Sequence, residues 1–202
     1  MISPVYWHPV IYQLFLRIIF GRQFEKRYQE VASFIPNGSR VVDICCGDAT
    51  AYRYFLRKKN VRYLGLDINP FFVRWLKKKR IPIRLFDVYR NEIPSAEYVI
   101  MLGSLYQFIP RHKEIMDKML KAATKKVIIT ERIQGAFSSS TNSLISYIAR
   151  RLANPGTGHA MHRFNEKKLV RFLMSYGAKL ERYYKICNNT QIVAVLIADK
   201  KF

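Results

Sequence analysis

The 202-residue chain is long enough to bury one substantial hydrophobic core, and half of its residues are hydrophobic, which excludes an intrinsically disordered protein. Lysine and arginine number 35 against 14 aspartate and glutamate residues, so the formal net charge is +21. A positive field of this size attracts nucleic acids, anionic membrane surfaces and acidic small molecules, although scattered basic residues can also serve solubility alone.

The cysteine and hydrophobic patterns exclude several classes of protein. The three cysteines make no even disulfide framework and no paired zinc-binding motif, so we expect a reduced, cytoplasmic setting and no metal site. The apolar run of residues 10–20 is interrupted by Gln13 and Arg17 and is too short to span a bilayer. The G-x-G-x-x-G dinucleotide fingerprint and the G-x-x-x-x-G-K-[ST] phosphate loop are both absent from the sequence.

Residues 1–33 are predicted to form a helical extension ahead of the core. The aromatic side chains of this segment, Tyr6 and Tyr12 among them, follow a helical spacing that is typical of core packing. The alternative is an amphipathic helix on an anionic membrane, with Arg27 and the other basic side chains of the segment toward the lipid headgroups. In that case the protein would be cytoplasmic but peripheral at the membrane.

Residues 34–202 alternate between β-rich runs and helical stretches, which predicts one α/β domain with a mainly parallel sheet. The expected strands cover residues 40–45, 61–67, 81–87, 96–104, 125–133, 179–187 and 190–201. The expected helices cover residues 49–59, 69–80, 112–123 and 165–177. Asn69 and Asn165 are strong helix-starting residues, and residues 134–164, rich in Ser, Gly, Asn and Thr, are predicted to form an inserted lid.

Three acidic residues end successive predicted strands: Asp43, Asp67 and Asp87. In a parallel sheet these strand ends meet at one edge, which is where nucleotide ligands bind. Gly47, in the turn after the first strand, permits a close backbone approach. Asp67 can accept hydrogen bonds from ribose hydroxyl groups, and Asp87 can accept one from the amino group of an adenine. The three acids together therefore predict a nucleotide-like pocket.

On these residues the chain resembles the class I S-adenosylmethionine-dependent methyltransferases across residues 34–201. That family carries a D-x-G-x-G-x-G turn after its first strand, and this chain reads DICCGDA there, with Cys45 and Ala49 in place of two glycines. The resemblance implies a seven-stranded, mostly parallel sheet with helices on both faces and an antiparallel last strand. It also implies that S-adenosylmethionine is held by Asp43, Cys45, Gly47, Asp67, Ile68, Asp87, Val88 and Gly103.

The resemblance places the methyl-transfer site directly after the fourth strand, at Tyr106 and Gln107. His162, in the predicted lid, is a further catalytic candidate. Methyl transfer needs an aligned acceptor and exclusion of water more than a covalent catalyst, and a general base is optional. A structural role competes with the functional one, because the Tyr106 ring can pack under a helix. The predicted acceptor-binding residues are Tyr6, Tyr12, Glu131, His159 and Arg163.

We therefore predict methyl transfer from S-adenosylmethionine to a small-molecule or lipid-like acceptor that is anionic or hydrophobic. The net charge keeps open an RNA or transfer RNA methyltransferase that uses the basic surface. Against this alternative, the [DNS]PP[YFW] tetrad of amino-directed nucleic-acid methyltransferases is replaced here by GSLY. A cofactor-binding scaffold without transfer activity is the third candidate.

Overall fold

The structure of the chain is a computed structural model that describes residues 25–133 and 164–198. Residues 1–24 and 134–163 lie outside the described residues. Most of the expected N-terminal extension and nearly all of the expected lid fall in these two ranges, so both stay predictions.

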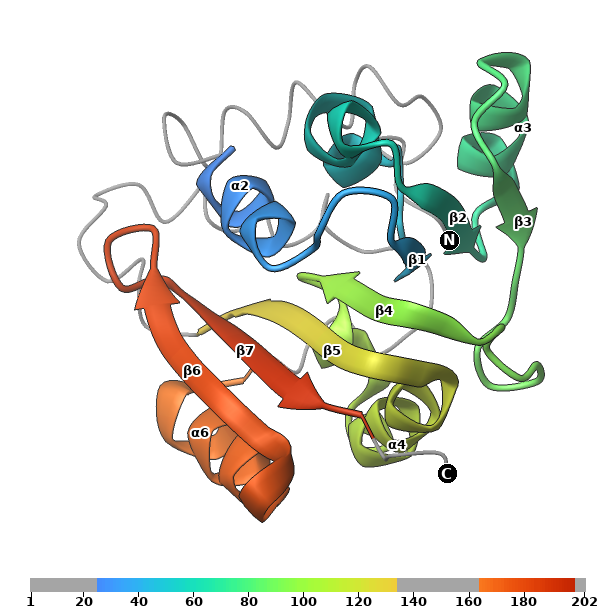
Figure 1. Cartoon of the computed structure of the whole chain (residues 1–202). Helices are drawn as coiled ribbons and strands as arrows, with labels where there is room; N and C mark the ends of the chain where they lie inside the picture. The colour runs from blue at the N-terminus through green and yellow to red at the C-terminus, as the bar shows by residue number, and fades with distance from the viewer. Residues whose placement is uncertain (1–24, 134–163, 199–202) are drawn as a thin grey trace, which may run out of the picture.

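One seven-stranded sheet runs through the molecule (Figure 1). Its strands are β1 (Arg40–Ile44), β2 (Arg62–Asp67), β3 (Ile83–Leu85), β4 (Ala96–Leu102), β5 (Ala123–Arg132), β6 (Leu180–Ile186) and β7 (Gln191–Ile197). Their spatial order is β3-β2-β1-β4-β5-β7-β6. Strands β1 to β5 pair in parallel, whereas β7 pairs antiparallel with both β5 and β6. The predicted fold class, with an antiparallel last strand, is confirmed.

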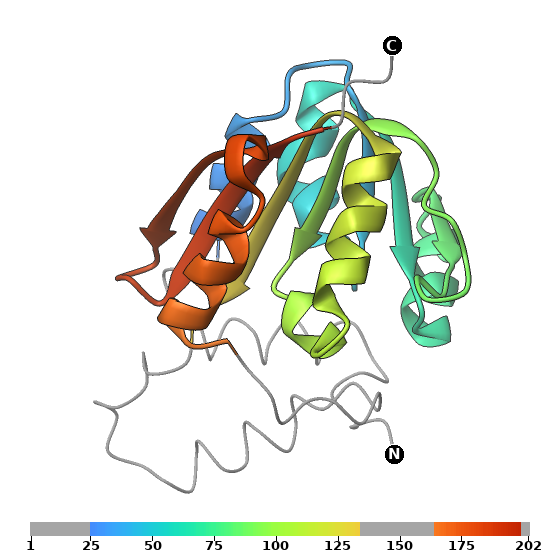
Figure 2. The same ribbon diagram turned by 90° about the horizontal axis from the view of Figure 1, so that it is seen from below.

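Helices cover both faces of this sheet (Figure 1). The first face carries α2 (Lys26–Ser33), η3 (Tyr52–Leu56), η4 (Arg57–Lys59) and α3 (Pro70–Lys78). The second face carries α4 (His112–Ala122) and α6 (Glu166–Met174), which Figure 2 shows side by side. Besides η4, the described residues form two further short 3-10 turns, η5 (Leu105–Phe108) and η6 (Gly177–Lys179). Because side chains alternate along a strand, Val99 and Ile100 enter two different cores, one under each helical layer.

Two asparagine side chains start helices as the sequence predicts. The Phe71 N–H donates to Asn69 Oδ1 over 2.9 Å at the start of α3, where Pro70 is the first helical residue. The Lys168 N–H donates to Asn165 Oδ1 over 2.8 Å at the start of α6. Each bond satisfies a backbone donor that lacks a partner inside its helix, and both predicted N-caps are confirmed.

The predicted regular helix over residues 49–59 is wrong in detail, because a π-helix, η3, and a 3-10 turn, η4, stand there. Aromatic packing accounts for the wider turn of η3. The Tyr52 ring stacks on Tyr63 of β2 with ring centroids 4.3 Å apart, and the Phe55 ring stacks on Tyr28 of α2 at 6.0 Å. Stacks on both neighbouring elements hold η3 in this position. Among residues 25–133 and 164–198, no helix is both long and apolar enough to cross a membrane.

Candidate functional site

The turn after β1 adopts a backbone that favours glycine at several positions. Cys45, Gly47 and Ala49 all have φ near +55°, in the left-handed region. Cys45 and Ala49 stand where the family motif carries glycine, and both adopt a backbone conformation that glycine reaches without strain. A non-glycine residue in this region costs about 1 to 2 kcal/mol, so the surrounding contacts must hold the turn in place.

Asp67, the last residue of β2, supplies one of these contacts. Its Oδ2 accepts a hydrogen bond from the Gly47 N–H over 2.7 Å, and its Oδ1 accepts one from the Asn69 N–H over 2.8 Å. Burial raises the pKa of this carboxyl to about 6, while the two N–H donors favour the ionised form. Each oxygen retains a second lone pair that can accept a hydroxyl group. Asp67 therefore connects the turn to β2 and remains able to bind a ligand.

Asp43, in β1, lies deeper beneath the same turn and is 2% exposed. The Tyr63 hydroxyl donates to its Oδ2 over 2.9 Å. Burial raises the pKa of the Asp43 carboxyl to about 8, the negative charges of Asp67 and Asp48 act in the same direction, and the Tyr63 bond opposes them. Asp43 therefore helps to support the turn from below, through a partner on the neighbouring strand that sequence analysis missed.

The close approach of β2 to the turn gives a testable prediction at Gly65. A Cβ atom at this position would lie 2.8 Å from Cys46 Sγ and 3.1 Å from the Tyr63 hydroxyl oxygen. Replacing Gly65 by alanine should lower the free energy of unfolding by about 1 to 3 kcal/mol, the usual cost of overpacking, as measured by urea denaturation. Adding Cys46→Ala removes the closest clash and should restore much of the loss, so a double variant as unstable as Gly65→Ala alone would contradict this account.

The other predicted cofactor-binding residues lie along the same edge of the sheet. Asp87 is half-buried after β3, and its Oδ1 accepts a hydrogen bond from the Tyr89 N–H over 2.9 Å within its own turn. Val88 is buried in the core under α4, whereas Ile68 is 54% exposed beside Asp67. Contacts of these three residues with a cofactor stay predictions.

Gly103 directly follows β4 with φ +67°, and its N–H donates to the Thr130 carbonyl of β5 over 2.7 Å. A Cβ atom there would lie 3.3 Å from Nη1 of Arg27. Arg27 is 6% exposed and donates to the Tyr28 hydroxyl over 2.5 Å, so the alternative in which this side chain faces lipid headgroups is wrong. The cause is the position of α2, which packs on β5 and β7 and turns Arg27 toward the sheet.

Tyr106 and Glu131 meet at the ends of β4 and β5. The Tyr106 side chain is 4% exposed and belongs to the core under α4, while its backbone N–H donates to Glu131 Oε2 over 3.1 Å. Glu131 is 1% exposed, and its Oε1 accepts from the Arg132 N–H over 2.9 Å. These contacts position the turn η5, in which Gln107 is half-buried. Catalytic or acceptor-binding roles for Tyr106, Gln107 and Glu131 stay predictions.

Two further polar side chains at this end of the sheet escaped sequence analysis. Thr130 of β5 is 0% exposed and Gln191 of β7 is 1% exposed. Within residues 25–133 and 164–198, Thr130 Oγ1 and Gln191 Nε2 have no hydrogen-bond partner. By strand alternation both side chains point to the face that α2 covers, the face on which Arg27 is buried. The local sequence gave no signal, because a buried donor is recognisable only when its neighbours on other strands are known.

The remaining predicted residues cannot be placed relative to this edge. Tyr6, Tyr12, His159, His162 and Arg163 lie outside the described residues. Within the described part of the chain, no group of three or more His, Cys, Asp or Glu side chains is arranged to hold a metal ion. Cys45, Cys46 and Cys187 are free thiols.

Comparison with protein families adds to this geometry. The family model described as "Methionine biosynthesis protein MetW" matches residues 25–139, which include the turn after β1 and the strand ends around it. None of the curated proteins matches the chain.

Solved structures share the fold at low sequence identity. A TehB-like SAM-dependent methyltransferase from Corynebacterium glutamicum is 15% identical, with a TM-score of 0.63 over 98% of this chain and 100% of its own. Magnesium protoporphyrin IX methyltransferase from Synechocystis PCC 6803, with bound SAH, is 13% identical, with a TM-score of 0.61 over 87% and 83%. The [4+2]-cyclase SpnF is 8% identical, with a TM-score of 0.64 over 88% and 81%. The chain therefore has the class I methyltransferase fold.

Proposed function

The chain belongs to the MetW family, and we propose that it transfers a methyl group from S-adenosylmethionine to a small-molecule acceptor that carries an anionic group. The observation that supports the cofactor most directly is the link between Asp67 and the Gly47 N–H, which joins a buried acceptor carboxylate to the left-handed turn after β1. The neighbours solved with SAH or SAM bound share this fold.

The residues present fit this cofactor. Asp67 supplies acceptor oxygens for two neighbouring hydroxyl groups, and the turn at Cys45 and Gly47 brings backbone rather than long side chains to the edge of the sheet. Gly103 removes a further side chain beside the end of β4. When bound, S-adenosylmethionine supplies a methyl group on a positively charged sulfur.

The protein's part in such a reaction is to align the acceptor and exclude water. Glu131 holds the backbone of η5 through the Tyr106 N–H, so it acts in this proposal as a positioning residue. Both Tyr106 and Glu131 are almost fully buried, which favours alignment over proton abstraction by either group. An acceptor that reacts without a strong general base, such as a thiolate or a neutral amine, suits this arrangement.

The anionic character of the acceptor is inferred from the buried donors under α2. Arg27 Nη1 would lie close to a Cβ atom at Gly103, and the Gly103 N–H is bonded to the backbone of Thr130. Thr130 Oγ1 and Gln191 Nε2 add two polar groups that have no hydrogen-bond partner among the described residues. A guanidinium, a hydroxyl and an amide suit a carboxylate or phosphate, because all three can donate hydrogen bonds.

Replacing Arg27 by methionine should raise KM for a carboxylate- or phosphate-bearing acceptor by roughly 10- to 150-fold, the equivalent of one lost charge-assisted hydrogen bond. Methyl transfer to a panel of acids, each paired with its neutral amide or alcohol, measures this effect. Lys26→Met is the matched control, because Lys26 is the exposed cation beside Arg27. An equal rise in KM for Lys26→Met, or for the neutral acceptors, would contradict the anionic subsite.

The first test of the function is calorimetric titration of the full chain with S-adenosylmethionine and S-adenosylhomocysteine, with NAD and ATP as controls. We expect the first two to bind and the controls to leave the heat signal flat. Binding only to NAD or ATP, or to none of the four, would overturn the proposed cofactor.

A cofactor-binding scaffold is the second candidate function. It is favoured by the structural roles of Tyr106 and Glu131, whose polar or ionisable groups are buried at the proposed transfer site. Tight S-adenosylhomocysteine binding without methyl transfer to any member of the acceptor panel would favour the scaffold. Detectable transfer to one member would exclude it.

A further inference from the structure

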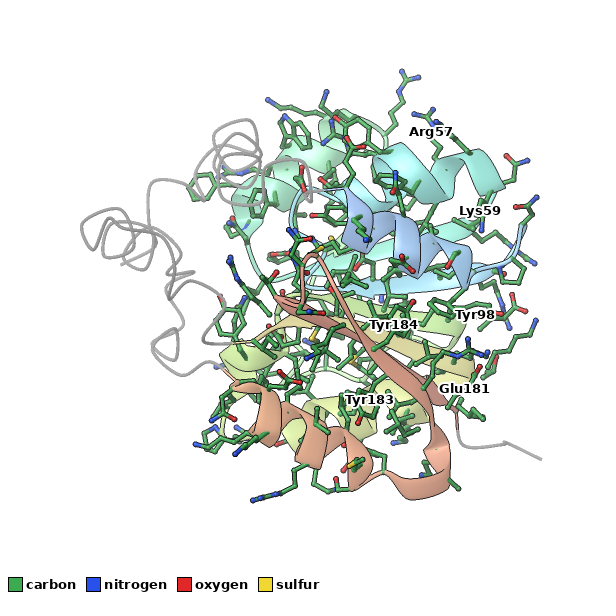
Figure 3. The ribbon with its side chains drawn as sticks, turned by 90° about the vertical axis from the view of Figure 1, so that its left-hand side faces the viewer. Arg57, Lys59, Tyr98, Glu181, Tyr183 and Tyr184 are labelled. Carbon is green, nitrogen blue, oxygen red and sulfur yellow. The ribbon has the colours of Figure 1, made fainter. Side chains whose placement is uncertain are left out.

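The surface formed by η3, η4 and α3 is unusually rich in positive charge. Residues 53–84 contain five lysines and six arginines against one acidic residue, Asp67, which is buried. The side chains that define what we term the basic face are all exposed: Arg57, Lys58, Arg74, Lys77, Lys78 and Arg80. Figure 1 shows η3, η4 and α3 in one helical layer, and Figure 3 shows Arg57 at its outer side.

None of these six side chains forms an ion pair with any residue in the ranges 25–133 and 164–198. Basic residues elsewhere on the surface behave differently. Lys113 pairs with Asp117 over 2.7 Å, Lys121 with Glu92 over 3.5 Å, and Lys185 with Glu166 over 3.1 Å. The charge of the basic face is therefore left for an external anion to neutralise, whereas the charges on the other surfaces are partly neutralised within the molecule.

Contacts between η3 and α3 join the two halves of this face. The Arg53 guanidinium lies 5.0 Å from the Tyr54 ring centroid and 4.8 Å from that of Trp75 in α3. Lys79 Nζ lies 4.8 Å from the same Trp75 centroid. Lys59 is turned inward, where it donates to the carbonyl groups of Ala32 and Ile35. These contacts hold the helices that carry the basic face in fixed positions relative to each other.

Exposed apolar side chains occur in the same stretch of the chain. Among the described residues, six large hydrophobic side chains are exposed; besides Ile68, a predicted cofactor residue, three of them, Tyr54, Phe71 and Leu85, fall within or next to this stretch. Arg74 lies over the Phe71 ring, with its guanidinium 5.0 Å from the ring centroid. Apolar side chains next to unpaired cations are the combination that binds the interface of an anionic bilayer, because headgroups take the charges while the acyl boundary takes the apolar groups.

We propose that the basic face docks this protein on an anionic phospholipid membrane. A lipid surface fits better than a nucleic acid, because aliphatic side chains such as Leu85 offer nothing to a phosphodiester chain. The rings on which a base could stack, Tyr54, Phe71 and Trp75, each already lie against a guanidinium group of the protein. The basic face contains no residue of the N-terminal segment, and the proposal does not depend on the proposed methyl transfer.

Co-sedimentation with vesicles tests the proposal on the full chain. We expect the protein to bind vesicles of phosphatidylglycerol mixed with phosphatidylcholine and not to bind vesicles of pure phosphatidylcholine. High salt should release the bound protein. A variant with Lys77→Gln, Lys78→Gln and Arg80→Gln should bind the anionic vesicles roughly 100-fold more weakly, at about fivefold for each lost charge near the surface. S-adenosylhomocysteine titration should give the same affinity for this variant as for the parent protein, which checks its fold.

The matched control carries Lys113→Gln, Lys121→Gln and Lys185→Gln, which remove the same number of charges from other surfaces. It should bind the anionic vesicles within a few-fold of the parent protein. Equal losses in both triple variants would overturn the proposal, because net charge alone would then explain binding. Loss of single-stranded RNA binding with unchanged vesicle binding in the first variant would also overturn it and assign the face to nucleic acid. Absence of vesicle binding in the parent protein would overturn it outright.

Discussion

Asp67→Asn is expected to weaken S-adenosylhomocysteine binding by roughly 5- to 150-fold, the equivalent of about 1 to 3 kcal/mol. In the parent protein both oxygens of Asp67 accept backbone N–H groups, from Gly47 and from Asn69. An asparagine has one acceptor oxygen and an NH2 group, so one of these N–H donors would face another donor. The variant therefore loses an anionic acceptor for the ligand and one support of the turn in a single change.

Calorimetric titration at pH 7.5, with circular dichroism to check folding, measures this effect. Since the pKa of Asp67 is raised to about 6, the parent protein should lose affinity as the pH falls through 6 and the carboxylate is protonated. The variant has no such group, so its affinity should change less over the same interval. Glu92→Gln removes one exposed negative charge and should bind like the parent protein. Unchanged affinity in a folded Asp67→Asn protein would contradict the assignment of the cofactor site to this edge of the sheet.

Most helices and strands could be predicted from local sequence patterns. Asn69 and Asn165 cap helices that begin within a residue of their predicted starts, because a cap depends on backbone groups only two or three residues away. The strand order and the antiparallel β7 came from the resemblance to a family, since alternating β-rich and helical runs do not specify which strand lies beside which. The π-helix η3 depends on rings in α2 and β2, so the helical pattern of its own residues could not reveal it.

The residues of the candidate site could likewise be predicted from local sequence, but their contacts could not. Asp43, Asp67 and Asp87 stand at or near the ends of their strands as expected, because strand ends can be recognised locally. Their partners could not be predicted: Tyr63 reaches Asp43 from the next strand, and Arg27 reaches the Gly103 region from a helix far away in sequence. Contacts between residues distant in the sequence require the packed structure, and they decide whether a charged side chain faces solvent or the core.

The second large effect is expected at Asp43 and concerns stability. The folded pKa of this carboxyl is about 8, well above its usual value of 3.8, chiefly because ionisation would bury a charge. A raised pKa means that the folded state binds the proton more tightly than the unfolded chain does. Stability from this group is therefore fully present below pH 4 and is lost as the pH rises toward 8. Ionisation of Asp67 lowers the free energy of unfolding in the same way, but this decrease is complete near pH 6. The decrease between pH 6 and pH 8 therefore comes mainly from Asp43.

Asp43→Asn keeps the shape of the side chain and an oxygen for the Tyr63 hydroxyl, but it cannot ionise. Urea denaturation at intervals from pH 5 to pH 9 should show the parent protein losing stability between pH 6 and pH 8 and the variant holding nearly constant, so that the variant is the more stable protein at pH 9. Glu114→Gln, which removes a half-buried charge on α4 that pairs with Arg111, should keep the slope of the parent protein. A slope that survives Asp43→Asn would mean that Asp43 is already ionised below pH 6. The buried carboxylate would then be held by its neighbours more strongly than the Tyr63 bond alone allows, and the turn above it would rest on a charged support.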